Sequence, residues 1–134
     1  CDFDLDEFRQ TEFALENSKL MSELDSRFVS LETICKERSG KKSFHILMMH
    51  YFEDMYHVLK ETRRVLSANS KAYLILGDSA PYGIYIPTTQ FLGEVAKSVG
   101  FNGYEICKIR SRGHKWKVKT RHNVELSENI LILE

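Results

Sequence analysis

The first residues whose types suggest chemistry follow a short apolar run. Ala72–Leu76 is continuously apolar, ends at Gly77-Asp78-Ser79 and is followed by Tyr82. Such a run predicts a strand buried on both faces, and open α/β sheets bind ligands beyond the carboxyl ends of their strands. Asp78 or Ser79 would then hydrogen-bond a substrate or orient a neighbouring loop. The structural alternative is a turn in which Asp and Ser bond their own backbone. The substrate-side candidates are Gly77, Asp78, Ser79 and Tyr82.

A basic stretch near the C-terminus is the second candidate. In Lys115-Trp116-Lys117-Val118-Lys119 every second residue is a lysine, so an extended ribbon would direct all of them to one face. That face can neutralise phosphates while Trp116 stacks on a base, and the flanking arginines can bind phosphate or guanine edges. The alternatives are a solvated loop or a sheet edge protected by lysines. The candidate DNA-binding residues are Arg110, Arg112, Lys115, Trp116, Lys117, Lys119 and Arg121.

Other reactive side chains point to structure rather than to chemistry. His50, Asp54 and His57 share one face of an expected helix, but surface histidines at such a spacing are far more common than metal ligands. The three cysteines lack the paired spacing of a zinc site and an activating neighbour. We therefore predict no metal site and no catalytic residue in this chain.

Charge and hydropathy narrow the class of protein. The formal net charge of the 134 residues is +0, but acidic side chains dominate 1–26 and basic ones dominate 107–122. Such asymmetry creates a local positive field on a neutral protein. The chain begins acidic, unlike a secretion signal, and has no apolar run near the length of a membrane span. We expect a cytoplasmic protein that associates with DNA and makes no membrane contact.

The spacing of apolar residues predicts an α/β fold. A helix between the first two expected strands is long enough to cross over, which favours a parallel pair, and the last two strands suit an antiparallel hairpin. The sheet is therefore expected to be mixed and mostly parallel, with flanking helices and a C-terminal hairpin. The expected helices are 5–31, which is irregular, 43–66 and 87–100, and the expected strands are 72–76, 101–109 and 129–133.

The later part of the chain resembles bacterial site-specific DNA modification methyltransferases. The run Tyr51-Phe52-Glu53-Asp54-Met55 through Leu59, Glu61 and Arg64-Val65-Leu66 is similar to the helix before the fifth strand of that family. Three later segments look like further landmarks of the family, and 43–134 is matched more closely than 1–42, a helical segment. The landmarks are Leu76-Gly77-Asp78-Ser79, Ile86-Pro87-Thr88 with Gly100-Phe101, and Arg121-His122-Asn123 with Glu128–Leu133.

The resemblance implies the later half of a class I, S-adenosylmethionine-dependent, Rossmann-like domain. The family's catalytic Pro-Pro-aromatic motif is missing, since the two prolines are not adjacent, and no Gly-x-Gly occurs where a cofactor loop would need it. In the family the aromatic residue of that motif stacks on an extruded base. S-adenosylmethionine is thus expected for the intact parent enzyme, and this chain alone is expected to be inactive.

The leading hypothesis is a fragment of a methyltransferase that modifies adenine N6 or cytosine N4, as in restriction-modification systems. It would supply sheet scaffold and DNA contacts. One alternative is a fragment of an RNA or small-molecule methyltransferase, because folds are shared among functions. The other is a non-catalytic domain that binds nucleic acid or a partner. A truncated sheet is also expected to self-associate or to pair with the missing half of its domain.

Overall fold

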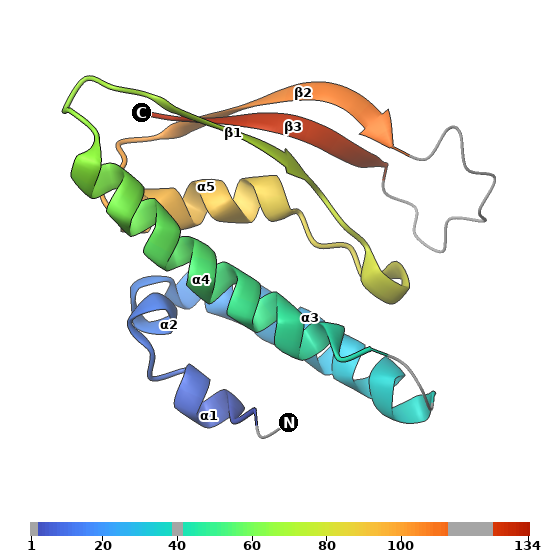
Figure 1. Ribbon diagram of the computed structural model, residues 1–134. Helices are drawn as coiled ribbons and strands as arrows, with labels where there is room; N and C mark the ends of the chain where they lie inside the picture. The colour runs from blue at the N-terminus through green and yellow to red at the C-terminus, as the bar shows by residue number, and fades with distance from the viewer. Residues whose placement is uncertain (1–2, 39–41, 113–124) are drawn as a thin grey trace.

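The computed structural model describes residues 3–38, 42–112 and 125–134, and shows helices against one face of a small sheet (Figure 1). None of the helices in these ranges combines the length and hydropathy needed to cross a bilayer. In chain order the elements are α1 (Leu5–Phe8), α2 (Glu12–Glu16), α3 (Ser18–Glu37), α4 (Phe44–Val65), β1 (Ala72–Gly77), the 3-10 turn η1 (Pro81–Gly83), α5 (Thr88–Ser98), β2 (Tyr104–Arg112) and β3 (Leu126–Leu133).

The N-terminal segment is helical but divided. The single irregular helix expected over 5–31 is wrong, because the chain leaves helical geometry before α2, at Thr11, and before α3, at Asn17. Asp4 accepts the backbone N–H groups of Asp6 and Glu7, and Thr11 accepts that of Ala14. These caps satisfy helix donors that would otherwise lack partners, so short helices form where one long helix was expected.

The helix predicted over 43–66 is confirmed as α4. One of its faces enters a core shared with α3 and α5, where Met49, Phe52 and Leu59 are almost completely buried. Arg63 and Arg64 lie in its last turn, where cations interact favourably with the negative end of the helix dipole. The helix predicted after Pro87 is confirmed as α5, and Gly100, with φ of +111°, follows its end in the left-handed region.

The fold is mixed α/β, and the antiparallel pairing of the last two strands is confirmed. The strand order is β1-β3-β2, and β3 runs antiparallel to both neighbours. The expected direct pairing of the first two strands is therefore wrong. β1 and β2 run in the same direction across the crossover helix α5, but β3 lies between them and takes the hydrogen bonds that each would have offered the other. Every strand pair in the described ranges is antiparallel, so the mostly parallel sheet expected from the sequence is not found there.

Candidate functional site

The carboxylate of Asp78, directly after β1, is buried and hydrogen-bonded. Asp78 is only 6% exposed. One oxygen accepts the backbone N–H of Thr89 at 3.0 Å and the Thr89 hydroxyl at 2.9 Å, and the other accepts the Tyr85 hydroxyl at 3.1 Å. Thr89 lies in the first turn of α5, so Asp78 acts as a helix cap contributed from a distant part of the chain.

The network continues into β3. The side-chain amide of Asn129 donates to the Thr89 hydroxyl at 2.9 Å, and both residues are buried. Burial and the neighbouring Asp78 carboxylate raise the pKa of Tyr85, which keeps its hydroxyl protonated as a donor. The network thus ties the end of β1 to α5 and β3. The sequence analysis did not predict this network. The polar residue Asn129 at an inward-facing position of β3, among apolar residues, could have indicated a buried hydrogen bond.

The other substrate-side candidates lie around the same turn. Gly77 ends β1 opposite Glu128, and the backbone of Ser79 bonds that of Ile86 in both directions while the residue itself is exposed. Tyr82 adopts φ of +51°, unusual for a residue with a side chain. Its hydroxyl accepts the N–H of Lys42 at 2.7 Å.

The ring of Tyr82 also packs on Phe44, with centroids 5.1 Å apart. The hydroxyl and the ring therefore hold η1 against the start of α4. Tyr82 therefore has a packing role in this turn. Of the substrate-side candidates, Ser79 is the residue that the structure leaves exposed.

Two glutamates, Glu128 in β3 and Glu125 just before this strand, lie beside basic residues of β2. The guanidinium of Arg110 donates to the Glu128 carboxylate across β2 and β3, and Lys108 lies 3.4 Å from Glu125. The sequence placed no acid among the basic residues of 107–122, but the antiparallel pairing brings these two acids beside them. The positive field expected at this place is therefore partly neutralised.

The remaining basic candidates are placed less fully. The backbone of Arg112 ends β2. Lys115, Trp116, Lys117, Lys119 and Arg121 lie outside the described residues, so their interface remains a prediction.

The two candidate regions lie at one end of the sheet. Glu128 of β3 pairs with Gly77 on one side and with Arg110 on the other. Figure 1 shows this end at the right, where β1 leads to η1 and β2 ends. Only β3 therefore separates Gly77, a substrate-side candidate, from Arg110, a DNA-binding candidate.

The histidines of α4 do not gather with other ligand-type side chains. In the described ranges no group of three or more His, Cys, Asp or Glu side chains lies close enough to hold a metal ion. His50 packs edge-on against Phe3, with ring centroids 5.4 Å apart. Comparisons of the chain with protein-family models, with curated proteins and with solved structures find no match.

Proposed function

We propose that this chain is the later part of a class I, S-adenosylmethionine-dependent DNA methyltransferase domain that modifies adenine N6 or cytosine N4. In that role it builds the part of the sheet beside the catalytic loop and binds the DNA backbone, in the cytoplasm. The proposal starts from the sequence resemblance described above. The catalytic and cofactor motifs belong to another part of the domain, because neither occurs in this chain.

The observation that carries the proposal is the antiparallel direction of the last strand. The last strand, β3, runs antiparallel between two strands that share a direction and are joined through α5. The resemblance implies a closing half in which a strand, a helix and a hairpin with an antiparallel last strand follow one another. The order of elements and the direction of the last strand agree with that expectation.

The position of the basic residues gives the proposal its second support. Arg110 lies at the same end of the sheet as the exit of β1, where this class of fold places its ligands. A DNA backbone bound by the hairpin would therefore lie near the end of β1, and lysines or arginines there would neutralise its phosphates. Asp78 does not contact substrate in this account, since Thr89 and Tyr85 occupy its carboxylate. It positions the turn that follows β1.

In this proposal none of the residues that the structure describes is assigned to binding S-adenosylmethionine. The sequence has no Gly-x-Gly loop, and the Asp78 carboxylate at the end of β1 is already bonded within the protein. The cofactor, which supplies the methyl group, is assigned to the part of the domain that carries the missing motifs. No chemical step is assigned to this chain.

Fluorescence anisotropy with a labelled duplex DNA tests the DNA-binding role. The test variant carries Lys115→Ala, Lys117→Ala and Lys119→Ala, and the control carries Lys19→Ala, Lys36→Ala and Lys97→Ala, which remove the same charge from the helices. The test variant should lose roughly tenfold or more in affinity at low salt, because each phosphate contact releases a counterion. The control should stay within about twofold.

Two results would contradict the role in DNA binding. One is no measurable affinity for DNA at low salt, and the other is an equal loss in both variants, which would indicate attraction by net charge alone. The same measurement with a duplex RNA of the same sequence distinguishes an RNA methyltransferase from a DNA methyltransferase. Stronger binding to the RNA would point to recognition of the 2′-hydroxyl groups and would replace DNA as the substrate class.

A further inference from the structure

The only Asn-Gly pair of the sequence is Asn102-Gly103, in the connection between α5 and β2. The side chain of an asparagine can be attacked by the main-chain nitrogen of the residue that follows it, and this attack closes a succinimide ring. Glycine in the following position favours the attack, because it has no Cβ to hinder the approach. The pair is therefore a candidate for spontaneous chemical modification.

The fold leaves the reacting groups of this pair free. Asn102 is exposed, and no atom outside the neighbouring residues lies within 4 Å of the place that a Cβ on Gly103 would take. In the described part of the chain, the N–H of Gly103 donates no hydrogen bond. That N–H must lose its proton before its nitrogen can attack, and no bond has to break first.

Two main-chain hydrogen bonds flank the peptide bond between Asn102 and Gly103. The N–H of Asn102 donates to the carbonyl of Glu134 at 2.7 Å, and the carbonyl of Gly103 accepts the N–H of Glu134 at 3.1 Å. Glu134 directly follows β3, so these bonds fasten the end of that strand. They hold the outer atoms of the pair and leave the side chain of Asn102 and the nitrogen of Gly103 unrestrained.

The other asparagines that the structure describes are better protected. Asn17 and Asn129 are 7% and 4% exposed, and both side chains donate hydrogen bonds. Asn69 is exposed, but the next residue, Ser70, carries a side chain and donates its N–H to a main-chain carbonyl at 3.1 Å. The fold therefore favours reaction at Asn102, and Asn69 is the internal comparison.

We propose that Asn102 is a site of deamidation, with water as the co-reactant. The nitrogen of Gly103 forms a bond to Cγ of Asn102, and the bond from Cγ to Nδ2 breaks. Nδ2 leaves as ammonia and takes the proton that the Gly103 nitrogen loses. Water then adds to either carbonyl carbon of the succinimide and breaks the bond from that carbon to the ring nitrogen. The product at this position is aspartate or isoaspartate, and nothing is oxidised or reduced.

The isoaspartate product alters the main chain beside the end of β3. Its backbone passes through the former side chain, which adds one carbon between Cα of Asn102 and the nitrogen of Gly103. The two flanking bonds then no longer fit Glu134 together, because hydrogen bonds weaken steeply with distance and angle. We expect the end of β3 to open locally, as segments held by few bonds do.

Asn102 lies at the opposite end of the sheet from the proposed DNA contacts. Leu133 pairs with Tyr104 near Asn102, whereas Glu128 pairs with Arg110 at the other end. In Figure 1 the connection from α5 to β2 and the C-terminus lie together at the left. The inference does not use the methyltransferase proposal, so the two stand or fall separately.

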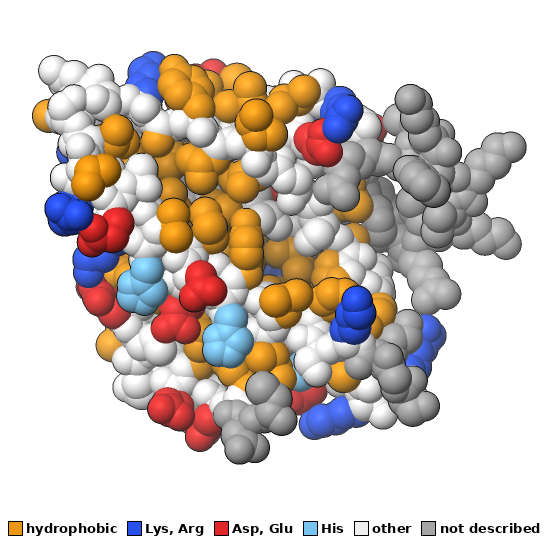
Figure 2. All heavy atoms as spheres, viewed as in Figure 1, with side chains coloured by type: hydrophobic (Ala, Val, Ile, Leu, Met, Phe, Trp, Pro, Cys, Tyr) orange, Lys and Arg blue, Asp and Glu red, His pale blue; other side chains and the backbone are white. Residues whose placement is uncertain are grey.

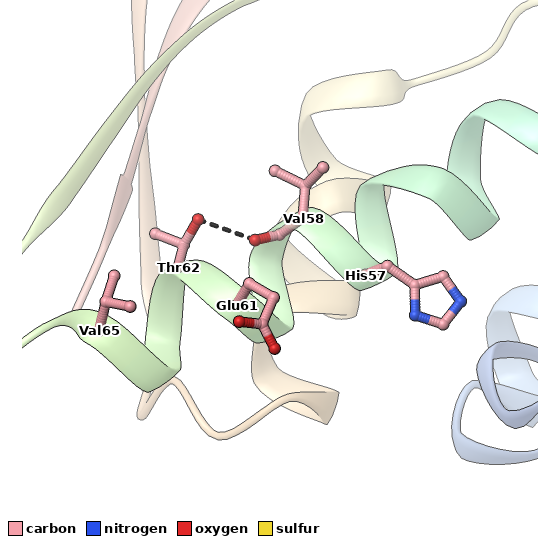
Figure 3. A pocket seen from close by; sticks show the side chains of 5 residues that line it. All are labelled: His57, Val58, Glu61, Thr62 and Val65. Carbon is pink, nitrogen blue, oxygen red and sulfur yellow. Dashed lines mark hydrogen bonds between the residues drawn. The ribbon is translucent and has the colours of Figure 1, made fainter.

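The exposed apolar side of α4 is a different surface. Figure 2 shows hydrophobic side chains gathered in a band between β1 and α4. In Figure 3, Val58 and Val65 point to one side of α4, whereas His57 and Glu61 point away from it. In the proposed domain the rest of the sheet continues beside β1 and covers this band. Deamidation at Asn102 needs no such partner, because this chain and water supply every atom of the reaction.

The test is peptide mapping by mass spectrometry after the folded chain has been incubated at pH 8 in water labelled with heavy oxygen. The label marks the residues that react during the incubation and not during digestion. Deamidation at Asn102 should be roughly tenfold or more faster than at Asn69, since Ser70 must first break a hydrogen bond and its side chain hinders the attack. Equal rates at the two asparagines, or no product at Asn102, would overturn the proposal.

Gly103→Ala is the matched variant. The added Cβ meets no other part of the described chain, so the fold should persist, but it lies beside the attacking nitrogen. The variant should slow deamidation of Asn102 severalfold and leave the rate at Asn69 unchanged. An unchanged rate at Asn102 would overturn the proposal.

Amide hydrogen exchange measures the consequence for the sheet. Chromatography separates the isoaspartate form, in which the amide of Glu134 should exchange faster than in the unmodified chain, because its bond to Gly103 is lost. Asn102→Asp adds the charge without the extra backbone carbon and should keep that amide protected. Equal protection of the Glu134 amide in the isoaspartate form and the unmodified chain, or equal loss in Asn102→Asp, would overturn the proposed effect on β3.

Discussion

The carboxylate of Asp78 receives two hydrogen bonds from Thr89, one from its backbone N–H at 3.0 Å and one from its hydroxyl at 2.9 Å. The two residues are eleven positions apart and belong to different elements. This relationship joins the end of β1 to the start of α5. We therefore interpret Asp78 as a residue that positions the turn after β1, and not as a substrate-binding residue.

Asp78→Asn should therefore destabilise the fold. The amide keeps the shape of the side chain but loses the charge that two donors of Thr89 and one of Tyr85 share, and bonds to a charged group contribute about 1.5–3 kcal/mol. We expect a loss of about that size in the free energy of unfolding, measured by urea denaturation. Ser79→Ala, at an exposed neighbour, should change it by less than about 0.5 kcal/mol. Equal stability of the two variants would remove the positioning role.

Gly93→Ala should destabilise the contact between α5 and β2. A Cβ at Gly93 would lie 2.6 Å from two carbons of the Tyr104 ring, and that ring is fixed by a 2.8 Å bond from its hydroxyl to Glu94. Overpacking of this kind costs about 1–3 kcal/mol, against about 1 kcal/mol that alanine gains over glycine in a helix. The measurement is again urea denaturation.

Two further variants decide whether the clash is the cause. Gly103→Ala should be nearly neutral, because no atom lies within 4 Å of the added Cβ. In a Tyr104→Ala background, Gly93→Ala should lose its penalty, since the ring that it meets is gone. A penalty that persists without the ring would contradict the steric account.

The pH dependence of stability should depend on His45. The residue is buried at the start of α4, its Nδ1 has no partner in the described part of the chain, and its ring packs on Phe28. Burial lowers the pKa of His45, with Glu32 acting against this shift and Lys36 in its favour. The unfolded chain then binds the proton more readily, so the free energy of unfolding falls as the pH drops below about 6.5.

His45→Phe should flatten the fall in stability between pH 7 and pH 5, as measured by thermal melting. His57→Gln changes an exposed histidine on the same helix and should keep the slope of the wild type. Identical slopes in the wild type and His45→Phe would show that protonation of His45 does not limit stability.

A salt bridge attaches α2 to α4. The Glu12 carboxylate accepts from Lys60 at 2.5 Å and from the Tyr56 hydroxyl at 3.1 Å, and these bonds hold the pKa of Glu12 below its usual value. A lowered pKa means stability that is present above about pH 4.5 and lost as the pH falls through the folded value. Glu12→Gln should thus lower the melting temperature slightly at pH 7 and not at pH 3.

Glu61→Gln is the control for this pair. It breaks an ion pair with Arg64 that lies within α4 and joins no second element. Its effect on the melting temperature should be smaller than that of Glu12→Gln, because exposed pairs within one helix contribute little. The reverse order would contradict the attachment of α2 through Glu12.

Local patterns in the sequence predicted most elements but not their arrangement. The apolar spacing of α4 reflects which face of that helix is buried, so periodicity alone predicts it, and the apolar run before Gly77 predicts a strand. The expected burial of that strand on both faces is wrong, because Tyr73 and Ile75 on one face of β1 are exposed. The place of β3 between β1 and β2 depends on which backbones meet after folding. No local spacing carries that information, and the predicted parallel pairing of β1 and β2 was wrong for this reason.

The candidate site shows the same division. Asp78 was selected from its position after an apolar run. Its partner Thr89 lies eleven residues away, and Asn129, which donates to the Thr89 hydroxyl, lies forty residues beyond Thr89, so the packing of α5 and β3 brings this network together. The predicted excess of basic residues covered 107–122 and did not include Glu125 and Glu128. Antiparallel pairing then placed Glu128 opposite Arg110.

The salt dependence of DNA affinity tests the central claim most directly. If the basic hairpin binds the DNA backbone, the logarithm of the association constant should fall linearly with the logarithm of salt concentration, with a slope of about −0.9 for each phosphate neutralised. The account predicts a slope of about −3 or steeper for the wild type. Replacing Lys115, Lys117 and Lys119 by alanine should make it shallower by roughly 3 units. A slope near zero, or one that these replacements leave unchanged, would contradict the claim that this chain supplies the DNA contacts of a methyltransferase.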